Sequence, residues 1–221
     1  MLRPALTLLS AGLLSAMLVT GCGVRFDDGP SATQTRSVAP FQRVTVNGST
    51  DVNVRLGDRT SVVVHGGRTV IDDVRTEVRD GTLVVERTDD DTLTLGGDDL
   101  RVDVVVPRVD AAEVHGSGDL DVDLDGRTVD ALDLAVQGSG DVHARGRVGT
   151  LHAAINGSGD LQLRSLRADD AAVSVQGSGD ADLRVERALD ATIDGSGDID
   201  YAGDPEVRSD VAGSGDLSRV D

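Results

Sequence analysis

Apolar and polar residues alternate through most of the second half of the chain, and a Gly-Ser-Gly-Asp tetrapeptide interrupts the alternation six times. An aliphatic residue lies two positions before each tetrapeptide, and an apolar residue follows it directly. The preceding residues are Val114, Val136, Ile155, Val175, Ile193 and Val211, and the following residues are Leu120, Val142, Leu161, Ala181, Ile199 and Leu217. Alternation with a period of two predicts strands with one buried face. Each repeat is therefore expected to form a strand, a Gly-rich turn and a second strand.

The repeats recur every 18 to 22 residues, which is typical of a solenoid. A unit this short cannot enclose a core of its own, but stacked units can share one. The sequence therefore predicts an all-β fold, a parallel β-helix or closely related β-solenoid, in which equivalent residues stack about 4.8 Å apart. Ser209 and Arg219 occupy apolar positions of the last repeat, as expected for a terminal rung.

The residues of the repeated turn have predictable structural roles. Both glycines are expected to adopt positive φ, a conformation that a Cβ atom opposes. The Ser and Asp side chains can accept hydrogen bonds from the N–H groups of their own turn. The turn glycines are Gly116, Gly118, Gly138, Gly140, Gly157, Gly159, Gly177, Gly179, Gly195, Gly197, Gly213 and Gly215. A decayed seventh copy begins at Gly48, and Thr50 replaces its second glycine.

Between residues 55 and 109 the short period is lost. Val-rich segments at 61–65, 82–88 and 100–107 are expected to form strands, and Arg-Asp-Gly-Thr at 79–82 predicts a hairpin turn. The acidic segment 88–100 is expected to be a loop or a hairpin. We interpret the whole region as larger, less regular rungs that cap the N-terminal end of the stack.

The first residues predict export. Arg3 precedes an apolar run, residues 5–19, that is short for a bilayer span. Cys22, the only cysteine of the chain, follows closely. This arrangement resembles the signal of bacterial lipoproteins, in which the cysteine becomes the lipidated first residue; an ordinary secretory signal or a lone membrane helix is the alternative. The expected divisions are a signal peptide at 1–21, lipidated Cys22 and a flexible tether at 22–37, and a folded domain at 38–221.

The segments follow one another in a recognisable order. Phe-Gln-Arg-Val-Thr-Val-Asn-Gly-Ser-Thr begins at Phe41, a Val-rich hairpin follows, and Val-Val-Val-Pro at 104–107 leads into the serial Gly-Ser-Gly-Asp turns. Over about residues 38–221 the sequence resembles the GIN domain, a domain of unknown function labelled as an auto-transporter adhesin head. The resemblance implies a β-helical domain on an exported bacterial lipoprotein, and it brings no catalytic residues with it.

The aspartates of the six turns are expected to stack in one column. They are Asp119, Asp141, Asp160, Asp180, Asp198 and Asp216. Neighbours about 5 Å apart repel by about 0.8 kcal/mol in water and by about 3 kcal/mol at an effective dielectric constant of 20. Two alternatives offset this repulsion: turn N–H groups that donate to each carboxylate, or a cation such as Ca²⁺ held between carboxylates of adjacent rungs.

A second acidic cluster, residues 121–126, matches the first half of an EF-hand loop. Leu132 occupies the position at which that loop requires a bidentate glutamate. Apolar residues also alternate with the aspartates. We therefore expect a strand with an acidic outer face and no calcium site of this kind.

Charge and composition limit the function classes. The formal net charge is −18, and all 21 basic residues are arginine. Such a protein repels nucleic acid, so none is expected as a partner. The four histidines are scattered, and aromatic residues, the usual platforms of glycan-cleaving β-helices, make up 1% of the chain. No catalytic residues and no cofactor are therefore expected.

These observations predict a non-enzymatic, exported protein of the cell envelope surface, attached to the membrane through lipid on Cys22. It is expected to bind an extracellular protein or glycan, as in adhesion, or to support envelope structure. The alternative is a Ca²⁺-stabilised solenoid that binds or cleaves a glycan. Unpaired strand edges at the solenoid ends also predict self-association.

Overall fold

The computed structural model describes residues 24–26, 31–68, 70–88, 93–95 and 100–220 of the 221-residue chain. Strands make up the regular structure of these residues, apart from a short 3₁₀ helix at Ile71–Asp73. No helix in the described ranges is long and apolar enough to cross a membrane. The predicted signal peptide, residues 1–21, and Cys22 lie outside these ranges.

Most strands of the solenoid pair in parallel with the equivalent strand of the neighbouring rung. Four long strands each run from one Gly-rich turn to the next: β11 (Leu120–Gly138), β12 (Val142–Gly157), β13 (Leu161–Gly177) and β14 (Ala181–Gly195). On their N-terminal side lie β3 (Arg43–Gly48), β4 (Asp51–Leu56) and β10 (Ala111–Gly116). The last rungs contain β15 (Ile199–Ala202), β16 (Glu206–Gly213) and β17 (Leu217–Arg219).

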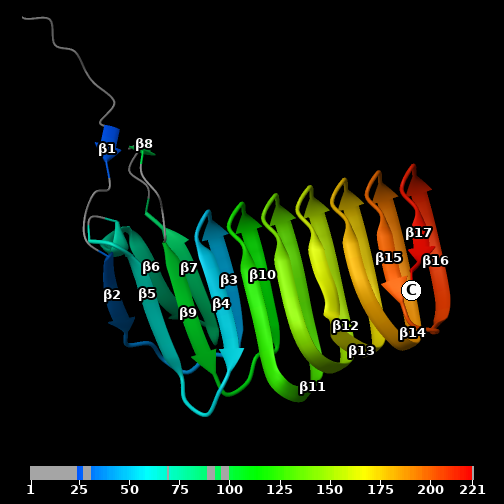
Figure 1. The fold of residues 1–221 in the computed structure, drawn as a ribbon, viewed down its shortest axis with the longest axis horizontal. Coiled ribbons are helices and arrows are strands. Elements are labelled where there is room, and N and C mark those ends of the chain that lie inside the picture. The colour runs from blue at the N-terminus through cyan, green and yellow to red at the C-terminus, as the bar shows by residue number, and fades with distance from the viewer. Residues whose placement is uncertain (1–23, 27–30, 69, 89–92, 96–99, 221) are drawn as a thin grey trace, which may run out of the picture.

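Each rung has two arms, and Figure 1 shows the rungs side by side along the length of the molecule. A long strand leaves a Gly-rich turn along one face, bends at the opposite edge and returns along the other face. Equivalent residues of successive repeats are in register, since Val114 pairs with Val136 and Val136 with Ile155. The predicted all-β solenoid, with repeats of about 20 residues and a less regular N-terminal region, is confirmed.

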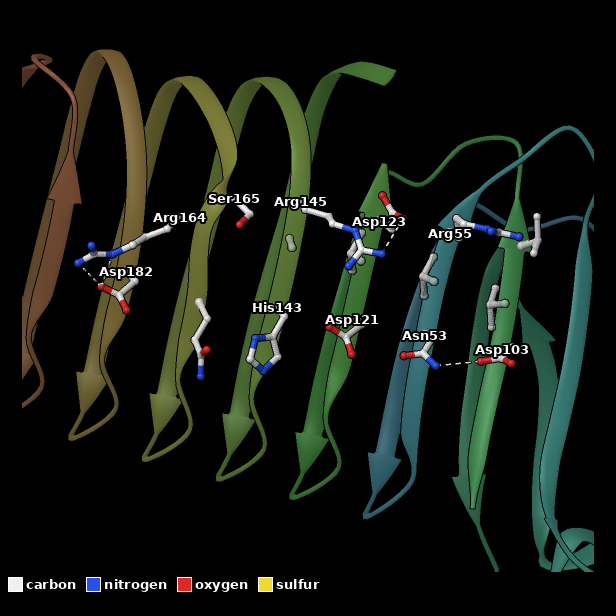
Figure 2. Close-up of a pocket in the computed structure, with 16 residues that line it drawn as sticks. Asn53, Arg55, Asp103, Asp121, Asp123, His143, Arg145, Arg164, Ser165 and Asp182 are labelled. Carbon is white, nitrogen blue, oxygen red and sulfur yellow. Dashed lines mark hydrogen bonds and ion pairs between the residues drawn. The ribbon is translucent and has the colours of Figure 1, made fainter. Parts of the chain in front are cut away.

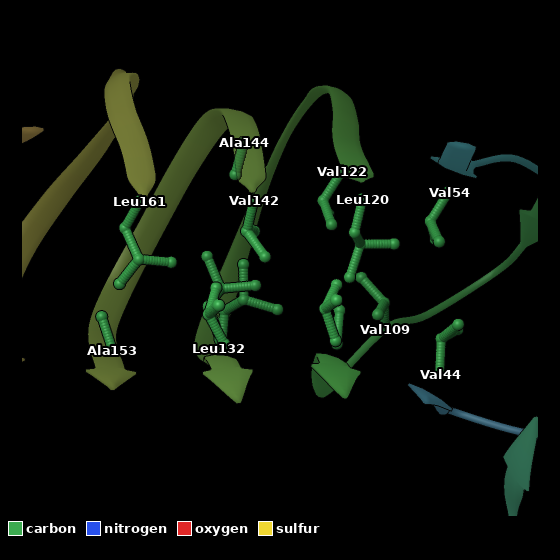
Figure 3. Packing of buried hydrophobic residues seen from close by; sticks show 14 of the residues in the cluster. Val44, Val54, Val109, Leu120, Val122, Leu132, Val142, Ala144, Ala153 and Leu161 are labelled. Atoms are coloured by element: carbon green, nitrogen blue, oxygen red, sulfur yellow. The ribbon is translucent and has the colours of Figure 1, made fainter. Parts of the chain in front are cut away.

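Aliphatic side chains from both arms fill the space between the two faces (Figure 3). Leu120, Val142 and Leu161 form one column in the arm after the turn, and none of them is exposed. Leu132 and Leu151 are equally well buried in the arm before it. Burial of each such side chain contributes about 1.5–3 kcal/mol. Stacking thus gives short repeats a continuous core that no single repeat can hold.

The N-terminal cap extends both faces of the solenoid and then changes strand direction. It contains β5 (Ser61–Gly67), β6 (Val74–Arg79), β7 (Thr82–Arg87) and β9 (Arg101–Val106). β7 and β9 pair in parallel with the first rung, whereas β6 and β5 add antiparallel strands outside them. The predicted hairpin turn is confirmed, since Asp80 (φ 50°) and Gly81 (φ 76°) connect β6 to β7.

Part of the predicted tether belongs to this cap. Ser31–Arg36 form β2, which pairs antiparallel with β5. Ala32 packs against the core, and the Arg36 guanidinium donates to the carbonyl oxygens of Ile71 and Val74, at 3.0 and 3.1 Å. The prediction of a flexible tether through residue 37 is therefore wrong for these residues, because they pair with an edge strand that the sequence leaves uncovered.

The acidic segment 88–100 contains a short strand, β8 (Leu93–Leu95), which pairs in parallel with β1 (Val24–Phe26). This two-stranded sheet is separate from the large sheet. Residues 89–92 and 96–99 lie outside the described ranges.

Candidate functional site

The Gly-Ser-Gly-Asp turns line one edge of the solenoid, and the first glycine of each turn has the predicted conformation. Its φ lies between 125° and 145° at residues 116, 138, 157, 177, 195 and 213. A side chain is strained in this region. The prediction of positive φ is therefore confirmed for the first glycine.

The second glycine of each turn is required for a different reason. None of these glycines has positive φ, so that part of the prediction is wrong. A Cβ atom at Gly159 would lie 2.0 Å from the carbonyl oxygen of Gly140, and one at Gly179 would lie 2.0 Å from that of Gly159. Backbones of adjacent rungs therefore approach too closely for any side chain, a contact that becomes visible only when the rungs are stacked.

Thr50, which replaces this glycine in the decayed copy, marks the start of the turn stack. Its side chain is completely buried, and Gly118 of the next rung packs against its carbonyl oxygen. On the other side lie β7 and β9, which no Gly-Ser-Gly-Asp turn connects. No earlier Gly-Ser-Gly-Asp turn therefore requires a glycine at this position.

The turn aspartates form a ladder of hydrogen bonds along the same edge. Each backbone N–H in the column donates to the carboxylate Oδ1 of the preceding rung, as Asp180 does to Asp160 and Asp160 to Asp141, both at 2.8 Å. The ladder includes Asp51 at its start, and its other bonds measure 2.7 to 3.1 Å. Bonds within a single turn were predicted; the carboxylates instead bridge adjacent rungs.

This ladder offers a structural way to offset repulsion along the column, since charge-assisted hydrogen bonds contribute about 1.5–3 kcal/mol each. Among the described residues, no three His, Cys, Asp or Glu side chains are grouped so that they could hold a metal ion. The hypothesis of a cation between two carboxylates stays a prediction.

A broad concave surface lies on the face formed by the arms after the turns. It is a groove of about 770 Å³ that crosses six neighbouring strands, β9, β4, β11, β12, β13 and β14 (Figure 2). Alternation directs the outward side chains of each arm into it. At the 4.8 Å spacing of strands, six strands span about 24 Å. The groove is long enough for an extended ligand that lies across the strands.

Hydrogen-bonding side chains line the groove in a row near the turns. Asn53, Asp121, His143 and Gln162 occupy successive register positions of four neighbouring strands. Their hydrogen-bonding groups alternate along the row between amide, carboxylate and imidazole. Such a row matches a polar polymer better than an apolar molecule.

A second row, nearer the opposite edge, carries charge. Arg55, Asp123 and Arg145 are in register, and Arg145 Nη2 lies 2.8 Å from Asp123 Oδ2. The hydrogen bond from Arg145 is the main cause that holds the pKa of Asp123 below its usual value, and it raises the pKa of Arg145. Arg164 pairs with Asp182 at 3.1 Å farther along. Charges of both signs thus line the groove, and Asp123 and Asp182 each pair with an arginine.

A polar network closes the N-terminal end of the groove. His65 Nε2 lies 2.9 Å from Asp103 Oδ2, and Thr33 Oγ1 lies 3.3 Å from His65 Nδ1. Asp103 also accepts from Asn53 and Arg101, at 2.9 and 3.2 Å. A hydroxyl, an imidazole and a carboxylate are the parts of a nucleophilic triad. Thr33 and His65, however, lie outside the groove lining, so a ligand in the groove would not contact the hydroxyl.

The sequence indicated this groove only in part. The predicted strand with an acidic outer face is confirmed, because the even-numbered residues 120, 122 and 124 are buried and the aspartates project outward. The groove itself is not visible in the sequence, since its lining residues Asn53 and Asp182 are 129 residues apart in the chain. The period-two pattern marks them as outward-facing residues, and only the stacking order brings them onto one surface.

Fold and groove together define a class: a β-solenoid of short repeats that gathers polar side chains on one face. A family model described as "Putative auto-transporter adhesin, head GIN domain" matches residues 40–205. The chain therefore belongs to this family, for which no catalytic activity is known. A comparison with curated proteins found no match.

Solved structures share the fold. A "putative adhesin" from Bacteroides fragilis is 20% identical, with a TM-score of 0.71 over 88% of this chain and 99% of that one. A "putative adhesin" from Parabacteroides merdae is 16% identical, with a TM-score of 0.57 over 90% and 100% of the two chains. A "putative lipid binding protein" from Parabacteroides distasonis is 19% identical, with a TM-score of 0.53 over 89% and 99%.

Proposed function

We propose that this protein is a non-enzymatic, surface-exposed binding module that acts in adhesion, and that its groove holds an extracellular glycan or protein segment. One observation carries the proposal: the outward side chains of six neighbouring strands converge on a single groove of about 770 Å³. A convex polar surface would have favoured a spacer. Membership of an adhesin family points in the same direction.

The chemistry of the groove favours binding over catalysis. Its arginines and carboxylates are largely paired with each other, as in Arg145–Asp123 and Arg164–Asp182. Catalytic acids and bases usually have pKa values moved toward neutrality, whereas that of Asp123 is moved away from it. Paired charges of both signs suit recognition of a polar ligand.

Adhesion by cells that display the full chain tests the groove. The probes are an array of neutral and acidic oligosaccharides and a panel of immobilised extracellular matrix proteins. The variant Arg145→Ala plus Arg164→Ala should lose at least about tenfold in binding to the probe that wild-type cells retain, because two charged groups of the groove disappear.

A matched control separates the groove from general charge effects. Arg127→Ala plus Arg187→Ala also removes two arginines that pair with aspartates, Asp58 and Asp170, but neither arginine lines the groove. These cells should bind like wild type. Equal losses in both variants, or no binding of any probe by wild-type cells, would count against the groove.

The proposed attachment to the membrane rests on Cys22 and the apolar run before it. Thiol lipidation anchors a protein stably when more than one acyl chain is present. The mature chain should therefore begin at Cys22, carry the mass of acyl groups, and sediment with membranes. In Cys22→Ser the protein should leave the membrane fraction, and membrane retention of this variant would contradict the anchor.

A further inference from the structure

The C-terminal end of the stack exposes a strand edge with unusual properties. β16 pairs with β14 along one side, and no other strand in the described ranges pairs with it. It lies at the red end of the solenoid in Figure 1. Val211 of this strand is 44% exposed, whereas its register partner Ile193 is 1% exposed. Val211 is the one large hydrophobic side chain in the described ranges that is exposed to this extent.

The direction of the free backbone groups follows from the register. Residues whose side chains face outward donate to the preceding rung, as Asp133 does to the Asp110 carbonyl oxygen at 2.9 Å. In β16 the outward-facing residues are Arg208 and Asp210, which match Asp190 and Thr192. Since peptide groups alternate along a strand, Val207, Ser209 and Val211 present their N–H and C=O groups to the unpaired side.

We propose that two copies of this chain pair antiparallel through β16, about a two-fold axis at Ser209. The sequence Val207-Arg208-Ser209-Asp210-Val211 is chemically self-complementary about its centre. Val207 then lies opposite the second copy's Val211, and Arg208 lies opposite its Asp210. Both valines face the core side, and both charges face outward, so each pair meets on one face.

This register satisfies charge and hydrogen bonding together over the whole of β16. An axis at Val207 also places Glu206 opposite Arg208, but it brings Pro205, which has no N–H group to donate, into a hydrogen-bonded position. In a hydrogen-bonded antiparallel pair, the two opposed residues both direct their N–H and C=O groups toward the partner strand. Only every second residue of β16 does so, and the two-fold axis must therefore lie at a residue and not between two residues. An axis at Asp210 opposes Asp210 to itself, and an axis at Arg208 opposes Arg208 to itself. Like charges directly opposite each other are destabilising.

Charged edge residues usually protect against strand pairing, but here they select one partner. Glu206, Arg208 and Asp210 alternate in sign along the edge. An unrelated strand does not in general carry the complementary charges at these positions, whereas a second copy paired antiparallel places Arg208 opposite Asp210 twice. The charges of β16 thus disfavour pairing with most strands and favour pairing with β16 of a second copy.

A cysteine placed on the axis tests the geometry. In the full chain, purified in detergent with Cys22→Ser, the variant Ser209→Cys is treated with a mild oxidant. The two residues of a hydrogen-bonded antiparallel pair have Cα atoms about 5.5 Å apart, within the 4.4–6.8 Å range of disulfides. We expect a covalent dimer. Thr192→Cys, an exposed position one strand farther in, should stay monomeric on denaturing gels because its two copies lie too far apart.

A charge exchange tests the register independently. Arg208→Asp should weaken dimerisation by at least about tenfold, measured by sedimentation, because it places like charges opposite each other twice in the dimer. Asp210→Arg should do the same. The double variant with both changes restores opposite charges and should dimerise like wild type. Circular dichroism and the melting temperature identify any variant that fails to fold.

Three outcomes would overturn the proposal. The first is a wild-type chain that stays monomeric up to about 100 μM, too weak an association for a stable edge pair. The second is a double variant that dimerises no better than either single variant. The third is mass that keeps growing with concentration beyond a dimer, which indicates head-to-tail stacking onto the N-terminal cap.

Discussion

At the scale of single residues, backbone contact between rungs is the tightest constraint in the molecule. A Cβ atom at Gly159 would lie 2.0 Å from the Gly140 carbonyl oxygen. Gly159→Ala should therefore lower the free energy of unfolding by about 1–3 kcal/mol or more, because neither backbone can move without disturbing the next rung. Urea denaturation measures the difference.

Ser158→Ala is the matched control, since Ser158 is exposed and lies in the same turn. Its effect should stay within about 0.5 kcal/mol. Equal losses in the two variants would mean that the turn sequence, rather than the approach of the two backbones, limits stability.

The ion pair of Asp123 with Arg145 predicts a pH dependence. The pKa of Asp123 is lowered in the folded state, chiefly by the hydrogen bond from Arg145. Its contribution to stability is therefore complete above the unfolded value of about 3.9 and is lost as pH falls through the lower folded value. Asp123→Asn should cost about 0.2–1 kcal/mol at pH 7, and little at pH 2. A difference that is constant with pH would contradict this assignment.

At the scale of the element, the aspartate ladder links each rung to the next. Asp160→Ala removes the acceptor of the Asp180 N–H, which lies 2.8 Å away. We expect a loss of about 1–2 kcal/mol in unfolding free energy. Asp160→Asn should lose less, because the amide oxygen still accepts and one charge leaves the column. Because both variants remove the charge, equal losses for Asn and Ala would show that charge, rather than the acceptor, matters.

Calcium distinguishes the two explanations of the column. Each Oδ1 from Asp51 to Asp198 already accepts a backbone N–H, so we expect millimolar Ca²⁺ to leave the melting temperature within the range of a salt-matched control. Ca²⁺ at 100 times the Kd of a site in the folded state would add about 2.7 kcal/mol to the free energy of unfolding. A clear rise that disappears in Asp160→Asn plus Asp180→Asn would establish a cation site instead.

The sequence predicts the elements well where local pattern decides them. Period-two alternation and the turn tetrapeptide are local, so strands such as β12 and β13 were predictable. β2 was not, because its six residues, five of them polar, form a strand only against the free edge of β5. The requirement for the second turn glycine was not predictable either. It comes from the carbonyl oxygen of the preceding rung and not from positive φ, and no single repeat contains that contact.

At the scale of the whole molecule, function depends on stacking order. Asn53, Asp121, His143 and Gln162 become neighbours only because four strands from different repeats pair in register. Each was predictable as an outward-facing residue, but the concave surface was not, because curvature arises from the assembled sheet. The repeats thus supply a scaffold, and the variable outward positions supply the chemistry.

A solenoid in which each rung contacts only its neighbours should tolerate removal of one complete rung. Deletion of residues 158–177 joins Gly157 to Ser178, and the register permits this because Gly157 and Gly177 already occupy equivalent positions. The shortened chain should retain its β-sheet circular dichroism and unfold cooperatively. It should do so at lower urea and with a smaller m-value, since less surface becomes exposed.

Deletion of residues 158–167 removes half a rung and serves as the control. It joins a turn to the wrong arm and directs polar side chains into the core, so this chain should not fold. If both deletions fold, or if neither does, the repeat is not the structural unit. The complete deletion also removes Gln162, Arg164 and Ser165 from the groove. A folded chain that has lost adhesion would therefore separate the stability of the stack from the binding chemistry it carries.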